Sequence, residues 1–126
     1  MEWKEPRWSA NFKYTYPNSL LQVKSMPIFS VNMKHTVESC PSFNETVKQK
    51  FKGLIGKRQE VAKKYDVKIL TAYTSTLDHL MFYIIEAPSQ QAIENYFMDI
   101  GLAFWNDIEI RLVKPVSEVI KKVTEE

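Results

Sequence analysis

Hydrophobic positions change their period several times between Pro27 and Pro115, and each change predicts an element. Runs of branched and aromatic residues typical of β-strands occupy residues 28–35, 67–74, 79–87 and 107–114. Apolar residues at every third or fourth position, typical of amphipathic helices, occupy residues 42–65, 92–100 and 117–123. The order βαββαβ, followed by a terminal helix, predicts an α+β ferredoxin-like fold. Such a fold has a four-stranded antiparallel sheet with two helices on one face.

Local signals predict how the helices begin and end. Ser42 and Glu45 have the spacing of a capping box, which satisfies two backbone donors at a helix start. Gly53 and Gly56 are interior helix residues, each costing about 1 kcal/mol relative to alanine, and close packing on the sheet is the simplest reason to expect them there. Gly101 is a credible end for the second helix.

The first 25 residues follow a different pattern from residues 26–126, which we assign to the ferredoxin-like domain. Their aromatic residues are scattered among polar ones without a sustained period. We interpret residues 1–25 as an irregular aromatic N-terminal arm. It can pack over the domain or against a partner, or it is a loosely held extension before an ancestral start at Met26.

The third strand predicts dimerisation. Leu80 to Ile85 are six successive apolar residues, so side chains on both faces of the sheet require burial. Two helices cover only one face, and leaving three large side chains in water would forgo roughly 1.5–3 kcal/mol each. A second sheet related by twofold symmetry would cover the other face and pair the chain as a homodimer. Alternatively, the N-terminal arm or the C-terminal helix covers this face within one chain.

Composition and charge narrow the class of protein. The 126 residues are 44% apolar and 25% charged, which is typical of one globular domain with an extension. A net charge of +2 gives no general attraction to nucleic acid or anionic membranes. The basic residues of the first helix are interspersed with acidic ones, as on a solvated face.

The longest apolar run is too short to span a membrane, and the N-terminus does not resemble a signal peptide. A single cysteine, Cys40, excludes an internal disulfide. These features predict a cytoplasmic protein with no membrane or nucleic-acid partner.

Residues 26–116 resemble the dimeric α/β-barrel superfamily. The resemblance is carried by the opening Met-Pro-Ile-Phe-Ser-Val strand, by the end of the third strand, Ile-Ile-Glu-Ala-Pro, and by the helix that follows. The superfamily includes small ligand-binding proteins, stress-responsive barrel proteins, muconolactone-isomerase-like enzymes and cofactor-free monooxygenases. The resemblance implies a homodimer with a cavity between helices and sheet, or between the two sheets. The resemblance does not specify an activity, because this fold hosts many functions. The aromatic arm of residues 1–25 has no counterpart in the compact pattern of the superfamily.

Strand alternation suggests residues for a ligand site. Ile108, Ile110 and Leu112 should pack under the helices, leaving alternate polar residues on the other face. That face is mixed in charge and can hold a small anionic ligand, while nearby aromatic residues can line a pocket or simply form core. The ligand-binding candidates are Asn32, Lys34, Tyr73, Tyr83, Glu109 and Arg111. Alternatively, Glu109 and Arg111 pair with charges across the dimer and fix its register.

Two histidines and the cysteine suggest a metal site. His35 ends the first strand and His79 begins the third, and these strands are antiparallel neighbours in the predicted fold, so the imidazoles can approach. Cys40 precedes the first helix, whose N-terminus stabilises a thiolate. Two histidines and one cysteine suit zinc, nickel or copper. The spacing matches no recognised metal motif, so solvated histidines and a buried cysteine are the alternative interpretation.

The sequence contains no nucleophile elbow, P-loop, dinucleotide fingerprint or zinc-protease motif, and its three glycines are too few for a phosphate-binding loop. We therefore expect a small homodimeric barrel protein that binds a small ligand or a metal ion in a sheet-lined pocket, with no cofactor unless a transition metal is bound. The alternative is a cofactor-independent monooxygenase or isomerase acting on a small aromatic or lactone substrate. His79 or His35 would then be the general base. A third interpretation is an interaction module that docks through the arm.

Overall fold

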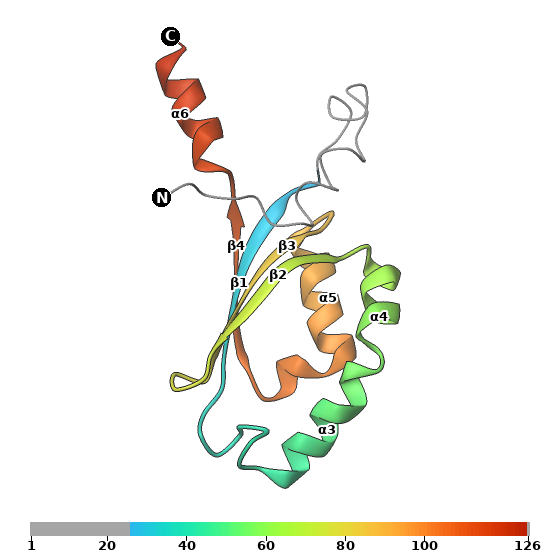
Figure 1. Cartoon of the computed structure of the whole chain (residues 1–126). Helices are drawn as coiled ribbons and strands as arrows, with labels where there is room; N and C mark the ends of the chain where they lie inside the picture. Colours follow the sequence, from blue (N-terminus) through green and yellow to red (C-terminus); the bar gives the residue numbers. More distant parts are fainter. Residues whose placement is uncertain (1–25, 126) are drawn as a thin grey trace.

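The computed structural model describes residues 26–125, which form an α+β domain with a four-stranded antiparallel sheet in the order β2-β3-β1-β4. Its elements are β1 (Ile28–Lys34), α3 (Glu45–Ile55), α4 (Arg58–Tyr65), β2 (Lys68–Ser75), β3 (Leu80–Glu86), α5 (Gln90–Ile100), η1 (Leu102–Phe104), β4 (Asp107–Val113) and α6 (Val116–Thr124). Helices α3, α4 and α5 lie on one side of the sheet (Figure 1). The arrangement is compatible with a ferredoxin-like fold and confirms the predicted order of elements. The arm predicted for residues 1–25 lies outside the described residues.

The hydrophobic core lies between the sheet and these helices. Phe29, Val31 and Met33 alternate along β1 on the helix side and are buried. Burying each such side chain contributes about 1.5–3 kcal/mol. In the register of β1 with β4, these residues are opposite Leu112, Ile110 and Ile108. The predicted alternation of the two faces of β4 is therefore confirmed, with Glu109 and Arg111 on the opposite face. The predicted packing under the helices holds for Ile108 and Ile110, but it is wrong for Leu112, which is 62% exposed.

The first helical segment differs from the single helix predicted for residues 42–65. It is divided into α3 and α4 at Gly56 and Lys57. The predicted close packing of the glycines is wrong, because a Cβ on Gly53 would meet nothing within 4 Å and one on Gly56 only a backbone oxygen at 3.9 Å. Glycine has a low helical propensity, which weakens the helix around Gly53 and at the break itself, where Gly56 caps α3.

The start of α3 also differs from the prediction. The N-cap is Asn44, whose Oδ1 accepts a hydrogen bond from the backbone N–H of Val47 at 3.1 Å. Ser42 lies two residues before this N-cap, in a turn in which the N–H groups of Phe43 and Asn44 donate to the carbonyl of Cys40. The end of α5 follows the prediction, since Gly101 adopts a left-handed φ of 91°.

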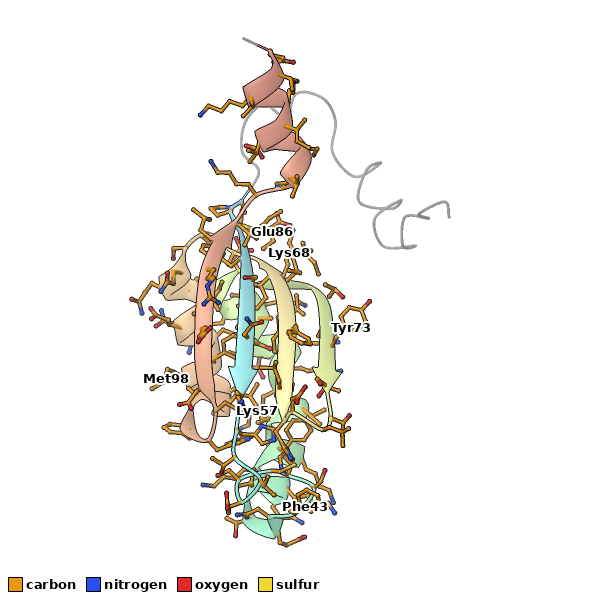
Figure 2. All side chains as sticks on the ribbon, turned by 90° about the vertical axis from the view of Figure 1, so that its left-hand side faces the viewer. Phe43, Lys57, Lys68, Tyr73, Glu86 and Met98 are labelled. Atoms are coloured by element: carbon orange, nitrogen blue, oxygen red, sulfur yellow. The ribbon has the colours of Figure 1, made fainter. Side chains whose placement is uncertain are left out.

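The face of the sheet opposite the helices is open in the described chain. Tyr73 and Phe82 on this face are 70% and 41% exposed. Figure 2 shows Tyr73 on β2, the edge strand at the right of the view. Helix α6 extends beyond the end of the sheet (Figure 1), and none of its residues is buried. It therefore leaves the open face uncovered and presents an exposed apolar stripe of its own, consisting of Val116, Val119, Ile120 and Val123.

None of the helices between residues 26 and 125 is long and apolar enough to cross a membrane.

Candidate metal centre

His35, Cys40 and His79 converge at one end of the sheet. Lys34 pairs with Leu80 at the last position of the β1–β3 register, so the next residues outward are His35 and His79. The N–H of His35 donates to the carbonyl of His79 at 3.2 Å, and the two ring centroids are 5.3 Å apart. One ligand atom from each histidine and the sulfur of Cys40 lie within 4.8 Å of one another. The predicted approach of the three side chains is confirmed.

The loop between β1 and α3 holds Cys40 in place. The backbone N–H of Cys40 donates to the carbonyl of Val37 at 3.2 Å, and its carbonyl accepts from the N–H of Asn44 at 2.8 Å. The side-chain amide of Asn44 also donates to the carbonyl of Glu38 at 2.9 Å. Asn44 therefore caps the helix and closes the loop, and Cys40, which it positions, is only 8% exposed.

The orientation of His35 is set by a buried asparagine. Asn106 donates through Nδ2 to the carbonyl of Leu102 at 2.9 Å, so its Oδ1 is the atom that faces Nδ1 of His35, at 3.0 Å. An amide oxygen only accepts, so Nδ1 of His35 must carry the proton. In the neutral imidazole, the other ring nitrogen, Nε2, is then a lone-pair acceptor.

Nε2 of His35 is buried and has no hydrogen-bond partner among residues 26–125. A buried polar atom without a partner costs about 1–3 kcal/mol. Metal-binding histidines characteristically donate their other ring N–H to an oxygen, which fixes the tautomer and ring orientation. Asn106 and His35 have this arrangement.

His79 is held by an unusual backbone conformation. It has a φ of 53°, in the left-handed region that is uncommon for residues other than glycine. The turn before it is closed by a hydrogen bond from the Ser75 hydroxyl to Asp78 at 2.8 Å and one from the N–H of His79 to the carbonyl of Thr76 at 3.3 Å. Left-handed backbone costs about 1–2 kcal/mol, and here it directs the imidazole toward His35.

Two imidazole nitrogens and one thiolate form a borderline-to-soft donor set. Zinc binds such ligands at about 2.0–2.3 Å, in tetrahedral geometry. Copper and nickel also accept imidazole, whereas magnesium and calcium require oxygen ligands. Three protein ligands leave a fourth tetrahedral position for water or an external group.

Five of the six residues predicted for ligand binding share one face of the sheet, and Tyr83 does not. Asn32 lies opposite Glu109 in the β1–β4 register, and Lys34, Tyr73 and Arg111 share the same open face. Arg111 pairs with Glu109 of its own chain at 3.0 Å, and both are well exposed, so the pair contributes little stability. Tyr83 lies on the opposite face, beneath the helices. Ligand binding by these residues stays a prediction.

Asn106, the partner of His35, was not among the predicted site residues, although the predicted topology contained a signal for it. Lys34 lies opposite Asp107 in the β1–β4 register, so the next residues outward are His35 and Asn106. A polar residue at that position, directly after the apolar segment Leu102–Trp105, is a candidate partner for the histidine.

Comparisons with models of protein families, with curated proteins and with solved structures found no match to this chain.

Proposed function

We propose that this domain binds one transition-metal ion, zinc or copper, through His35, Cys40 and His79. The observation that carries the proposal is the buried Nε2 of His35, which has no partner among the described residues although His35 belongs to a cluster with Cys40 and His79 in which one ligand atom from each residue lies within 4.8 Å of the others. A bound metal would satisfy this atom. The hydrogen bond from His35 to Asn106 and the strained backbone of His79 both support a site built for a ligand.

The same histidines are the general-base candidates of a cofactor-free monooxygenase or isomerase. A base needs one imidazole within reach of the substrate proton. It does not need a second imidazole and a thiol beside it. The presence of Cys40 in the cluster therefore favours metal binding over this alternative.

Calorimetric titration of untagged protein with Zn²⁺, followed by elemental analysis, tests the proposal. We expect one tightly bound ion per chain, released by a chelator. His35→Ala and Cys40→Ser should each weaken binding at least about tenfold, because each removes a ligand bond. Ser42→Ala is the matched control, since Ser42 lies in the same loop and is exposed. Absence of binding, or equal loss in the control, would contradict the proposal.

We also propose that two chains pair through their open faces as a dimeric α/β barrel. The exposed aromatic rings of Phe82 and Tyr73 give each sheet an apolar surface. Arg111 and Glu109 supply opposite charges beside it. A twofold pair makes such a mixed surface complementary to itself. A small ligand held by the predicted open-face residues would then lie between the two sheets.

Light scattering after size-exclusion chromatography tests the pairing. The wild-type chain should have the mass of a dimer, and Phe82→Glu should have that of a monomer, because it places a charge at the centre of the apolar surface. Leu77→Glu is the control, since Leu77 is 95% exposed in the β2–β3 turn. A wild-type monomer would remove this part of the proposal without affecting the metal site.

The single cysteine must stay reduced to serve as a thiolate ligand. A reducing compartment provides that condition, and we therefore infer a cytoplasmic location.

A further inference from the structure

A second candidate site lies on the helix side of the sheet, apart from the three metal-ligand candidates. Helices α3, α4 and α5 and strands β2 and β3 surround a cavity of about 450 Å³. This volume is in the range of small-molecule sites, which are mostly apolar with a few convergent polar groups. The residues that line it include Arg58, Met81, Tyr83, Tyr96 and Phe97.

Two tyrosines line the cavity on either side of Phe97. The ring centroid of Phe97 is 5.7 Å from that of Tyr83 and 5.1 Å from that of Tyr96, both edge to face. The hydroxyl of Tyr83 donates only to the sulfur of Met81, at 3.6 Å, and a thioether is a weak acceptor. Tyr96 is 2% exposed, and its hydroxyl has no hydrogen bond within residues 26–125. Neither hydroxyl has a strong acceptor among residues 26–125, so both have unused donor capacity where they line the cavity.

Arg58, the first residue of α4, adds a positive charge at the same cavity. Its guanidinium acts on both tyrosines: it lowers the pKa of each, although burial is the larger effect and raises the pKa of Tyr83 to about 12. Both phenols therefore stay protonated donors at neutral pH. Arg58 makes no ion pair with a carboxylate of the described chain.

We propose that this cavity binds a small carboxylic acid with an apolar body. Arg58 would pair with the carboxylate, the hydroxyls of Tyr96 and Tyr83 would donate to its oxygens, and the apolar walls would enclose the rest of the molecule. A neutral apolar ligand would leave all three donors unused. A free phosphate would leave the apolar walls empty. The inference goes beyond the proposed metal binding and does not depend on it.

The test is a titration of the full chain, followed by NMR of the Met81 methyl group and by calorimetry. The probes are benzoate, trans-cinnamate and octanoate, each paired with its neutral amide. At least one carboxylate should bind saturably and shift the Met81 methyl signal, while its amide binds about tenfold more weakly, because a hydrogen bond to a charged group is lost.

The variants locate the charge that is recognised. Arg58→Gln should lose about tenfold in affinity for the carboxylate and none for the amide, and Tyr96→Phe should lose less. Lys63→Gln, an exposed charge on the same helix that does not line the cavity, should bind as wild type. His35→Ala should also bind as wild type, which separates this site from the metal site.

The inference would be overturned by no saturable binding of any of the three carboxylates, by equal affinity for acid and amide, or by unchanged affinity in Arg58→Gln. Arg58 is exposed, so its variant should fold. Loss of binding in Lys63→Gln as large as in Arg58→Gln would show nonspecific attraction to a basic surface, which also overturns it.

Discussion

The two ends of the β1–β3 pair each bury a polar atom that has no partner among the described residues: Nε2 of His35 at one end and Oε2 of Glu86 at the other. Figure 2 shows Glu86 at one end of the sheet and Phe43, whose ring lies 6.2 Å from that of His79, beyond the other. Around His35 stand a second imidazole and a thiol. Among residues 26–125, no imidazole or thiol stands beside Glu86.

At Glu86, burial acts on the proton equilibrium of the carboxyl itself. Burial raises the pKa of its carboxyl, and the charge of Lys68, its cross-strand partner, offsets this in part. His35 is instead fixed as a lone-pair acceptor by Asn106. An unpartnered buried atom therefore indicates a ligand only where other donors converge on it.

The largest expected effect is stabilisation by metal at the His35 end. A ligand that binds only the folded state stabilises it by about 4 kcal/mol at a thousandfold excess over Kd. We expect Zn²⁺ to raise the Tm of the wild-type chain markedly and to leave His35→Ala unchanged. Thermal unfolding with Zn²⁺ and with chelator measures this, and Glu86→Gln should keep the full response. If Zn²⁺ raised the Tm of His35→Ala as much as that of the wild-type chain, the His35 end would not be the metal site.

The next effect concerns Asn106, which positions His35. Asn106→Leu removes the acceptor for Nδ1 and should weaken Zn²⁺ binding about tenfold or more, as loss of such partners does in other metal sites. Asn106→Asp keeps an oxygen at this position and should restore most of the affinity. If both variants bind as wild type, the tautomer of His35 is not set by Asn106.

His79 allows stability and binding to be separated. His79→Gly should relieve the left-handed backbone and stabilise the metal-free domain by about 1 kcal/mol, while it abolishes stabilisation by Zn²⁺. His79→Ala is the matched control, because it loses the imidazole but keeps the strain. Urea unfolding of both variants provides the comparison. Equal stability of the glycine and alanine variants would show that the φ of His79 stores no strain.

The smallest effect is expected at Glu86 and depends on pH. Its folded-state pKa is raised above the ordinary value of 4.5, so the stability it contributes is fully present below that pH and is lost as the pH rises through the folded pKa. Glu86→Gln should therefore be more stable than wild type at neutral pH by about 1 kcal/mol. The difference should vanish on acidification. If Glu86→Gln instead gained stability over the wild type as the pH falls, burial would not disfavour the ionised carboxylate of Glu86.

Sequence patterns predicted most of this architecture because strands with a period of two and capped helices are local signals. The approach of His35 and His79 followed from antiparallel neighbours alone. The break at Gly56 was missed because the apolar stripe continues across it, from Ile55 to Val61. The cavity at Arg58 was missed because it depends on how side chains from separate elements pack, and the periodicity of hydrophobic residues within one element does not predict this.

The most direct test of the metal site is the absorption spectrum of the protein with one equivalent of Co²⁺, a spectroscopic substitute for zinc. We predict thiolate-to-cobalt charge transfer and the intense visible bands of tetrahedral cobalt in the wild-type chain. Cys40→Ser should lose the charge-transfer band, while Ser42→Ala should keep it. A wild-type spectrum no different from that of cobalt in buffer would contradict the account.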